Sequence, residues 1–517
     1  MAKPQEKLVE SLETLRKLQE QGIVAVRSRD LTRTHRERLQ SNGFLKEVMK
    51  GWYISSRPNE AEGDSTAWYT SFWDFCAAYL KVRFENDWCL SPEQSLSLHT
   101  GNRTVPTQLL VRSPKGGNKP TKLPHNTSLF DVRLELPNED EIVEKDGLRL
   151  YSVPAALAAS PERFFRQAST DVRAAMAMVK DASDVLAVLL EGGHSTIAGR
   201  LAGAFRNAGR DRIADQIIRT MKNAGYTVPE VDPFESGPPI ALDIREASPY
   251  VNRIRLMWEE MRKPVIEKFP AAPGLPINVD AYLKHVEEIY AADAYHSLSI
   301  EGYRVSTELI ERMRIGAWNP DDDENDREHR NALAARGYWQ AYQVVQESLE
   351  KILAGENQGR VVDEDHSKWY GELFGPSVTA GIIGAVDLAG YRNSPVYIRR
   401  SMHVPPPREA VRDCMPALFD LLGEETEPAV RVVLGHFFFV YIHPYVDGNG
   451  RMGRFLMNTM LASGGYPWTI VPVEERNEYM AALEEASVGG NIGPFTEFLA
   501  HLVNAGLEGK AAPEIPS

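Results

Sequence analysis

The stretch HPYVDGNGRMGR, residues 443–454, is the part of the sequence around which the rest of the chain is organised. The preceding run VRVVLGHFFFVYI, residues 430–442, is apolar on nearly every side, which is typical of a helix buried at the centre of a domain. Pro444 should end that helix at His443. A second helix is predicted over residues 451–461, closed by Gly464 and Gly465.

The loop between these two predicted helices suits an anionic ligand. Gly448-Asn449-Gly450 precede a helix start, where unpaired backbone N–H groups and the positive end of the helix dipole favour phosphate. Arg451 and Arg454 are three residues apart, on one face of the new helix, so both guanidinium groups can bind phosphate oxygens bidentately. The pattern predicts a phosphate site.

Two further residues of the stretch add reactive chemistry. Asp447 is a hard oxygen ligand suited to a magnesium ion shared with phosphates. His443 has a side chain whose ordinary pKa is near neutrality, so it could take a proton from an attacking hydroxyl. Each residue alone is better explained as ordinary structure, but the set together indicates nucleotide phosphoryl chemistry.

The stretch resembles the signature of Fic-domain proteins, His-x-Phe-x-Asp/Glu-Gly-Asn-Gly-Arg-x-x-Arg, with Tyr445 where that family usually has Phe. Most members transfer AMP from ATP to a hydroxyl side chain of a target protein. The resemblance implies that His443 is the general base and Asp447 the magnesium ligand. It also implies that the phosphates are bound by Gly448, Asn449, Gly450, Arg451 and Arg454. The match extends from about residue 239 to residue 507.

An upstream segment, Ser297-Leu-Ser-Ile-Glu-Gly302, fits the Ser/Thr-x-x-x-Glu-Gly/Asn inhibitory motif of many Fic proteins. A carboxylate at Glu301 placed against Arg454 would occupy the position that a γ-phosphate needs. The alternative is an exposed helix glutamate. Because the motif accompanies a full signature in the usual order, we predict that Glu301 inhibits the site, with Ser297 and Gly302 completing the motif.

Two more sets of residues are assigned by position relative to the family. The segment from Gly390 to Arg400 has strand-like sequence bounded by turn residues, and in Fic proteins this region forms a flap hairpin that aligns the target by strand addition. The residues expected to dock the target are Val396, Tyr397 and Ile398. The residues expected to border the adenine are Asn477 and Tyr479.

Composition limits the class of protein. The formal net charge of −14 argues against extensive coating of nucleic acid or membrane. The three cysteines are too few and too scattered for a disulfide framework or a zinc site, so a reduced, cytoplasmic compartment is expected. The N-terminus lacks the apolar core of a signal peptide, and no apolar run is long enough to span a membrane.

The N-terminal residues predict a small basic module. A helix over residues 4–21, a basic helix over 28–39 and a hairpin over 43–54 follow one another in winged-helix order. The residues that such a module would direct toward DNA are Arg33, Arg36 and Arg38. The alternative is a module that docks protein, with these arginines merely solvated. The segment also resembles the N-terminal domain of abortive-infection type IV antitoxins, which implies a regulatory role.

The predicted fold class is mainly α. An all-helical Fic domain with a small flap hairpin should follow an N-terminal winged helix and a mixed α/β region. The predicted boundaries are a winged helix over 1–58, an antitoxin-like domain over 59–226, a Pro-rich linker over 227–240 and the Fic domain over 241–510.

The predicted function is an adenylyltransferase that uses Mg²⁺ and ATP on a Ser, Thr or Tyr hydroxyl of a target protein or of itself, autoinhibited by Glu301. Within enzymes, the same site could instead remove AMP or transfer another nucleotide such as UMP. From a different class, the chain could be a DNA-binding regulator whose Fic half senses nucleotide. Many Fic proteins self-associate, so a homo-oligomer is also considered.

Overall fold

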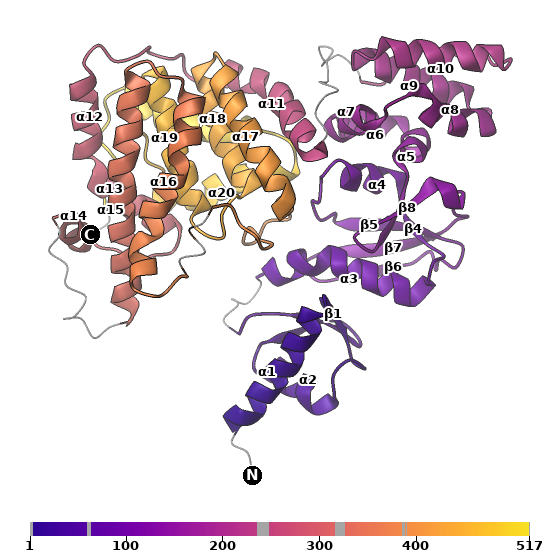
Figure 1. Ribbon diagram of the computed structural model, residues 1–517, viewed down its shortest axis with the longest axis horizontal. Helices are drawn as coiled ribbons and strands as arrows, with labels where there is room; N and C mark the ends of the chain where they lie inside the picture. Colours follow the sequence, from indigo (N-terminus) through magenta and orange to yellow (C-terminus); the bar gives the residue numbers. More distant parts are fainter. Residues whose placement is uncertain are drawn as a thin grey trace. The chain divides into compact units, whose positions relative to one another are not determined.

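The computed structural model describes residues 4–58, 64–234, 248–315, 326–384, 388 and 390–515. The chain divides into two units (Figure 1). The N-terminal unit comprises Met1–Arg253 together with Tyr397–Val404, and the C-terminal unit comprises Ile254–Val396 and Pro405–Ser517. The three cysteines, Cys76, Cys89 and Cys414, are buried and free.

The N-terminal unit begins with α1 (Pro4–Glu20), β1 (Ala25–Arg27), α2 (Arg33–Ser41), β2 (Leu45–Met49) and β3 (Trp52–Ser55). The predicted hairpin is confirmed, because β2 pairs antiparallel with β3, and β1 completes a sheet of order β1-β3-β2. The basic helix starts later than predicted, since the hydroxyl of Thr32 rather than Ser28 caps it by accepting from the backbone N–H of His35. Apolar residues of α1, α2 and this sheet form one small core.

The middle of this unit combines two sheets with two helices, α3 (Thr66–Phe84) and α4 (Pro92–His99). A four-stranded sheet has the order β4-β5-β7-β6, with β5 and β7 parallel. Its strands are β4 (Cys89–Leu90), β5 (Gln108–Ser113), β6 (Pro120–Lys122) and β7 (Ser128–Arg133). After the short helix η1 (Glu139–Glu141), β8 (Ile142–Lys145) and β9 (Leu148–Tyr151) form an antiparallel pair. The aromatic side chains of α3 lie in the core of this region.

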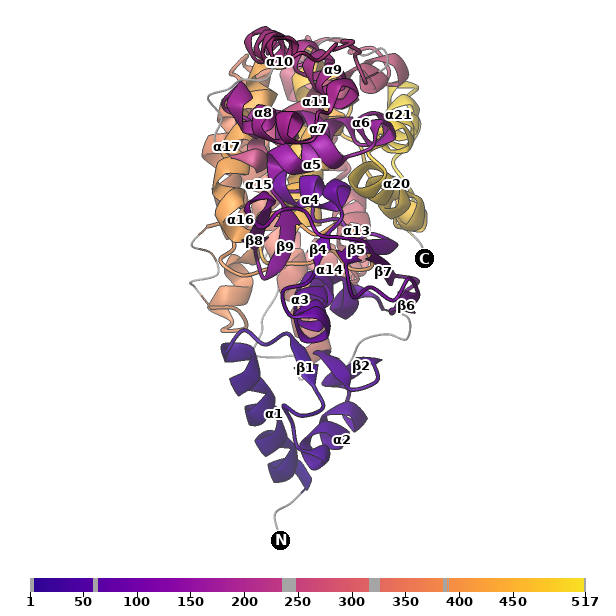
Figure 2. The same ribbon diagram turned by 90° about the vertical axis from the view of Figure 1, so that its right-hand side faces the viewer.

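After β9, the regular structure of the N-terminal unit is helical. The helices of this part are α5 (Val153–Ala159), α6 (Glu162–Gln167), α7 (Ser169–Met178), α8 (Ala182–Glu191), α9 (Ser195–Asn207) and α10 (Asp211–Asn223). They share a single apolar core. Within this unit the three cores follow one another along the chain, with α1 and α2 at one end and α8 to α10 at the other (Figure 2).

The predicted linker is ordered where the structure describes it. Residues 227–234 lie against α9, because a Cβ at Gly199 would be 1.8 Å from the carbonyl oxygen of Pro229 and one at Gly203 would be 2.2 Å from that of Val231. These two helix glycines are therefore required for close approach. Residues 235–240 and the predicted domain start at 241 lie outside the described residues, and the division between units falls within α11 (Pro249–Lys268).

The regular secondary structure in the described residues of the C-terminal unit is all helical. Besides most of α11 it contains α12 (Val279–Glu288), α13 (Tyr290–Ile300), α14 (Thr307–Arg314), α15 (Asp326–Leu353), α16 (Gln358–Thr379), α17 (Arg408–Glu424), α18 (Pro428–Ile442), α19 (Asn449–Gly464), η4 (Val473–Glu475), α20 (Arg476–Val488) and α21 (Gly493–Leu507). Helices α12 and α13 follow each other directly and are separated at Ile289. No described helix is both long enough and apolar enough to cross a membrane.

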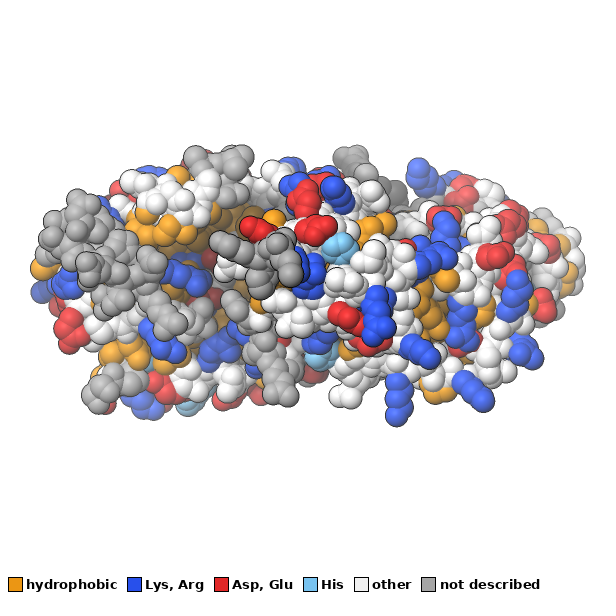
Figure 3. All heavy atoms as spheres, turned by 90° about the horizontal axis from the view of Figure 1, so that it is seen from below, with side chains coloured by type: hydrophobic (Ala, Val, Ile, Leu, Met, Phe, Trp, Pro, Cys, Tyr) orange, Lys and Arg blue, Asp and Glu red, His pale blue; other side chains and the backbone are white. Residues whose placement is uncertain are grey.

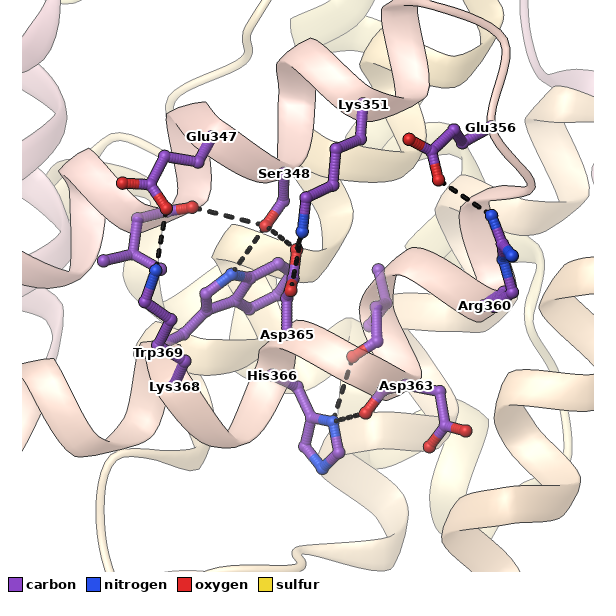
Figure 4. A network of polar contacts seen from close by, with 12 residues as sticks. Glu347, Ser348, Lys351, Glu356, Arg360, Asp363, Asp365, His366, Lys368 and Trp369 are labelled. Atoms are coloured by element: carbon purple, nitrogen blue, oxygen red, sulfur yellow. Dashed lines mark hydrogen bonds and ion pairs between the residues drawn. The ribbon is translucent and has the colours of Figure 1, made fainter.

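The two helices that flank the 443–454 stretch lie at the centre of this unit. Helices α18 and α19 pack on each other, and α15, α16 and α17 cover them (Figure 1). A polar network fastens α16 to α15 (Figure 4). Trp369 donates to the hydroxyl of Ser348 at 3.0 Å, Ser348 donates to Asp365 at 2.7 Å, and Lys351 pairs with the same carboxylate at 2.8 Å.

The predicted flap hairpin is not formed, so that part of the expected fold is wrong. Residues 390–398 are irregular, without a strand. The backbone N–H of Arg392 donates to the carbonyl of Pro444 at 2.9 Å instead of to a strand. Residues 397–404 belong to the N-terminal unit, where the carbonyl of Met402 accepts from the N–H of Val105 at 3.0 Å. Proline at 395 and at 405–407 also limits strand pairing here.

Candidate functional site

Within the 443–454 stretch, residues 443–448 form a loop between two helices and residues 449–454 begin the second helix, α19. Helix α18 ends at Ile442, and His443 follows with φ 54° and ψ 60°, in the left-handed region. Pro444 lacks an N–H and cannot continue the helix. Gly448, at φ 80°, precedes the first residue of α19. A non-glycine residue in the left-handed region costs about 1–2 kcal/mol, so surrounding contacts must hold His443 in place.

Asn449 and Tyr445 fix the shape of the loop. The side-chain oxygen of Asn449 accepts from the backbone N–H of Tyr445 at 2.9 Å, and its side-chain nitrogen donates to the carbonyl of Tyr445 at 2.9 Å. The ring of Tyr445 stacks on that of Tyr370, with centroids 3.8 Å apart and planes 8° apart. The amide of Asn449 is thus engaged by the loop itself. A direct contact between Asn449 and phosphate remains a prediction.

The imidazole of His443 is arranged as a base. Its Nδ1 lies 3.2 Å from the carbonyl oxygen of Val440, and because a carbonyl only accepts, Nδ1 carries the proton. Nε2 is then the nitrogen with a free lone pair. Burial, together with the nearby charge of Arg392, lowers the pKa of His443 to about 4. The side chain is therefore neutral at physiological pH.

A buried arginine that sequence reasoning missed holds the backbone around His443. Arg392 is 2% exposed. Its Nε donates to the carbonyl of His443 at 2.7 Å, and one Nη donates to the carbonyls of Pro406 at 2.5 Å and Ile442 at 3.3 Å. Arg392 lies in the segment from Gly390 to Arg400 that was singled out as strand-like, but its partners are distant in the sequence.

Arg454 links the loop to the predicted inhibitory segment. The guanidinium donates through Nε to the hydroxyl of Ser297 at 2.9 Å, and through one Nη to the Ser297 carbonyl at 2.9 Å and to Oε1 of Glu301 at 2.8 Å. Burial alone would raise the pKa of Glu301, but the charges of Arg454 and Arg451 hold this pKa below its usual value. Glu301 and Arg454 are thus an ion pair, as the motif predicts.

The end of α13 sets the position of Glu301. The N–H of Gly302 donates to the carbonyl of Ser299 at 2.9 Å, and the N–H of Tyr303 donates to that of Leu298 at 3.1 Å. This is the hydrogen-bond pattern of a Schellman motif, with Gly302 at φ 86° in the left-handed position. Gly302 therefore ends the helix so that Glu301 projects from its last turn.

The carboxylate of Glu301 lies directly over the start of α19. A Cβ built on Gly450 would be 2.2 Å from Oε1 of Glu301 and 3.2 Å from an Nη of Arg454. A Cβ on Gly448 would be 2.6 Å from the ring of Phe374. Only glycine fits at these two positions, and at Gly450 it lets a negatively charged oxygen approach the helix N-terminus.

Arg451 and Arg454 are buried and retain unpaired donors. Arg451 is 1% exposed, with its guanidinium 5.1 Å from the ring centroid of Tyr303 and 4.9 Å from that of Phe374. Within the described part of the chain, Nε of Arg451 and one Nη of Arg454 have no hydrogen-bond partner. Leaving a buried charged donor unsatisfied costs more than about 1–3 kcal/mol. These donors indicate a site for an anion.

The carboxylate of Asp447 is the accessible acidic group of the loop. Its side chain is 65% exposed, and Oδ2 lies 3.8 Å from an Nη of Arg451. No cluster of three or more His, Cys, Asp or Glu side chains that could hold a metal occurs among the described residues. A single carboxylate fits Mg²⁺ that is bound mainly through phosphate oxygens and water. It does not fit a metal held by protein side chains alone.

The two residues expected near adenine lie in different surroundings. The ring of Tyr479 is 2% exposed and packs against Phe495 and Phe498, and its hydroxyl is 2.7 Å from Nε2 of His436. Tyr479 is thus a core residue in this structure. Asn477 lies on the exposed side of the first turn of α20. Contact of either residue with adenine remains a prediction.

The expected docking residues lie where the two units meet in the sequence. Val396 belongs to the C-terminal unit, and Tyr397 and Ile398 belong to the N-terminal unit. Arg399, which follows them, pairs with the buried carboxylate of Asp64 at 3.0 Å. The docking role itself remains a prediction.

The arginines predicted to contact DNA are engaged locally. Arg33 pairs with Glu37 at 2.6 Å on the exposed face of α2, and Arg36 donates to the carbonyl of Ser28 at 3.1 Å. Arg38 turns toward α1, where it donates to the carbonyl of Lys7 at 2.6 Å. Acidic and basic side chains are intermixed over the face drawn in Figure 3.

Comparison with known proteins supports the identity of this loop. A sequence model described as the Fic/DOC family matches residues 366–461, which include the 443–454 stretch. The chain is 28% identical over 255 residues to a protein adenylyltransferase Fic of Nematostella vectensis, covering 48% of this chain and 55% of the relative. It is 30% identical over 229 residues to the protein of the same name in Drosophila willistoni, covering 43% and 42%. The chain thus spans about half the length of the curated relatives it matches.

Solved structures of Fic proteins are also similar. Fic-1 from Caenorhabditis elegans, residues 134–508, aligns with 66% of this chain and 95% of its own, at 20% identity and a TM-score of 0.37. A Fic-domain signalling protein of Bacteroides thetaiotaomicron aligns with 50% of this chain and 100% of its own, at 16% identity and a TM-score of 0.35. The match to the Fic/DOC family model, over residues 366–461, lies within the C-terminal unit of this chain.

Proposed function

We propose that this chain is a protein adenylyltransferase that moves AMP from Mg-ATP to a hydroxyl side chain of a target protein or of itself. The observation that carries the proposal is the pair of buried arginines, Arg451 and Arg454, whose unpaired donors adjoin the glycine-initiated start of α19. Unpaired cationic donors at a helix N-terminus fit the phosphates of a nucleotide. The relatives named protein adenylyltransferase Fic supply the reaction.

In the proposed reaction, Nε2 of His443 accepts the proton of a Ser, Thr or Tyr hydroxyl. The hydroxyl oxygen forms a bond to the α-phosphorus of ATP, and the bond from that phosphorus to the bridging oxygen breaks, so pyrophosphate leaves. The backbone N–H of Gly450 and the guanidiniums of Arg451 and Arg454 stabilise the negative charge that develops. The N–H of Gly448, which donates to Oδ1 of Asp447 at 2.7 Å, joins them when that bond is exchanged for a phosphate oxygen. Positioning and electrostatics supply most of the rate enhancement.

Asp447 is the residue that would hold Mg²⁺, together with the phosphates. Bound there, the ion neutralises phosphate charge and orients the leaving group. The exposed side chain of Asp447 at the mouth of the loop fits this role.

We further propose that Glu301 inhibits the site. Its Oε1 accepts from Arg454 and lies over Gly450, so it uses a donor and a space that an ATP phosphate oxygen would need. The two anions cannot share that position without strong repulsion. The side chain of Glu301 is still 31% exposed, so it can turn away without disrupting the core.

The test is intact-mass and peptide mass spectrometry after incubation with Mg-ATP and a cell extract. We compare wild type, Glu301→Gly, Glu301→Gly with His443→Ala, and Glu308→Gly, which removes an exposed glutamate from α14 as a matched control. The AMP adduct should be strongest in Glu301→Gly, absent from the double variant and unchanged from wild type in Glu308→Gly. The complete absence of an adduct would contradict the proposed transfer. A nucleotide panel including UTP and an AMP-modified substrate then tests the two alternative reactions.

A DNA-binding function of the N-terminal unit is a second candidate, favoured by the local excess of basic residues from Arg27 to Lys50. All three predicted DNA ligands, Arg33, Arg36 and Arg38, already have contacts within the unit. We therefore rank this function below AMP transfer. A gel shift with the full chain at increasing salt tests it, since phosphate contacts make DNA affinity fall steeply with salt.

A further inference from the structure

We propose that Arg392 is a positioning residue for His443, holding the backbone of the base in its left-handed conformation through hydrogen bonds to the carbonyls on either side. This inference rests on the proposed function, because it assigns His443 as the base. It identifies a residue outside the 443–454 stretch that supports the geometry of the site.

The backbone at the end of α18 needs hydrogen-bond donors from outside the helix. The last carbonyls of a helix have no partner within it. Here the chain also leaves α18 through a histidine at φ 54°, and Pro444 has no N–H to donate back. A left-handed non-glycine residue persists only where its surroundings fix it.

Arg392 supplies the missing donors. Nε donates to the carbonyl of His443 at 2.7 Å, and one Nη donates to the carbonyl of Ile442 at 3.3 Å. The backbone N–H of Arg392 donates to the carbonyl of Pro444 at 2.9 Å. Three consecutive carbonyls, of residues 442, 443 and 444, are thus held by one residue, and the guanidinium also places a positive charge at the negative end of the helix dipole.

Arg392 is itself held firmly. The guanidinium also donates to the carbonyl of Pro406 at 2.5 Å and is 2% exposed. The neighbouring Tyr391 donates its hydroxyl to Nε2 of His366 at 2.9 Å, since Nδ1 of His366 donates to the carbonyls of Val362 and Asp363, at 2.9 Å each. The loop that carries Arg392 is therefore anchored to α16 as well as to α18.

The consequence is a defined imidazole. With its backbone fixed, His443 directs Nδ1–H to the carbonyl of Val440 at 3.2 Å, which leaves Nε2 unprotonated. The charged groups that act on this ring are Arg392, Glu301 and Asp447. Arg392 disfavours the protonated ring and the two carboxylates favour it, so loss of Arg392 changes both the geometry and the ionisation of the base.

The experiment compares Arg392→Gln, Arg392→Lys and Arg408→Gln, each in the Glu301→Gly background. Arg408 is the matched control, because it also donates to a carbonyl of the same loop, that of Asn393 at 3.1 Å, but its side chain is 57% exposed. For Arg392→Gln we expect kcat of AMP transfer to fall at least about 100-fold, the range of a lost or misplaced general base. KM for ATP should stay within about threefold, because the phosphate ligands are untouched.

A second readout needs neither ATP nor a target. Proton–nitrogen correlation NMR of the histidine rings, with His443 assigned by loss of its signal in His443→Ala, reports the tautomer and the titration. Wild type and Arg408→Gln should show Nδ1–H only, whereas Arg392→Gln should show a tautomer mixture and a higher apparent pKa. Arg392→Lys keeps the positive charge but lacks the planar guanidinium that donates to several carbonyls. It should therefore bring the pKa of His443 back toward the wild-type value more fully than it restores the Nδ1–H tautomer.

The outcomes separate this inference from the proposed function. An unchanged tautomer and unchanged kcat in Arg392→Gln overturn the inference even when transfer is observed. An altered tautomer in a chain that transfers no AMP supports the inference and contradicts the function. If Arg392→Gln fails to fold, Arg392→Lys is the deciding variant. A wild-type tautomer of His443 in Arg392→Lys would show that the guanidinium hydrogen bonds do not fix the imidazole.

Discussion

Arginines are grouped in two regions of this molecule, helix α2 and the start of α19. The arginines of the two regions differ in their burial and in their hydrogen-bond partners. In α2, Arg33 is exposed and pairs with Glu37 one turn away, and Arg38 donates to the carbonyl of Lys7. In the first two turns of α19, Arg451 and Arg454 are buried and keep unpaired N–H groups. An exposed arginine satisfied by its neighbours needs no ligand, whereas a buried one with an unused donor does. Density of basic residues alone does not distinguish the two.

The largest expected effect is that of His443, the proposed general base, on the rate of AMP transfer. His443→Ala should lower AMP transfer by about 10²–10⁴-fold, the usual contribution of a general base. The exposed His285 is the control, because His285→Ala removes the same side chain from α12, outside the loop. Single-turnover transfer in the Glu301→Gly background measures the effect. Equal rates for the two alanine variants would show that His443 is not the base.

The next largest expected effect is that of Arg454 on ATP binding. Arg454→Ala should weaken ATP binding by about 10- to 150-fold, since a hydrogen bond to a charged group contributes about 1.5–3 kcal/mol. Arg312→Ala, at the exposed end of α14, should leave ATP binding unchanged. Calorimetric titration in the Glu301→Gly background supplies both dissociation constants. Similar constants for Arg454→Ala and the background variant would remove Arg454 from the phosphate site.

The comparison also predicts how stability depends on pH. Burial lowers the pKa of both His436 and His443 to about 4 in the folded chain, against an ordinary value of about 6.5. Between these values the unfolded chain binds more protons, so the free energy of unfolding rises with pH from about 4 to about 6.5 and is then level with respect to these two groups. Urea unfolding of wild type and His436→Gln at pH 5 and pH 7 tests this. In His436→Gln, the free energy of unfolding should differ less between pH 5 and pH 7 than it does in wild type.

The smallest effects belong to the exposed arginines of α2. Arg33→Ala should change the free energy of unfolding by no more than about 0.5 kcal/mol, because exposed ion pairs contribute little. Arg38→Ala should lower it by about 1–3 kcal/mol, because the carbonyl of Lys7 and the hydroxyl of Ser11 each lose one charged donor. Hydrogen exchange of α1 and α2 distinguishes the variants. A larger effect for Arg33 than for Arg38 would reverse the assignment made from their contacts.

The sequence predicted local features well and distant contacts poorly. The boundaries of α18 and α19 follow from Pro444 and the glycines near 448–450, and the ion pair of Glu301 with Arg454 follows from a recognised motif. Each of these depends on residues close in the sequence or on a known pattern.

The features that sequence reasoning missed depend on partners far along the chain. Arg392 meets carbonyls 50 residues or more away, at Ile442 and His443, and no periodicity reveals such a contact. The flap hairpin was predicted from strand-like residues, but the backbone N–H of Arg392 bonds to Pro444 instead. The amide of Asn449 is bonded to Tyr445, which only the geometry of the turn shows.

The central claim is that the carboxylate of Glu301 occupies the position of an ATP phosphate oxygen. The most direct test is the affinity for Mg-ATP of wild type, Glu301→Gly and Glu308→Gly, measured by calorimetry in the absence of any target. The structure predicts that Glu301→Gly binds about 10- to 100-fold more tightly than wild type and that Glu308→Gly does not, since one charge-assisted hydrogen bond to Arg454 becomes available. Equal affinities for wild type and Glu301→Gly would contradict the claim.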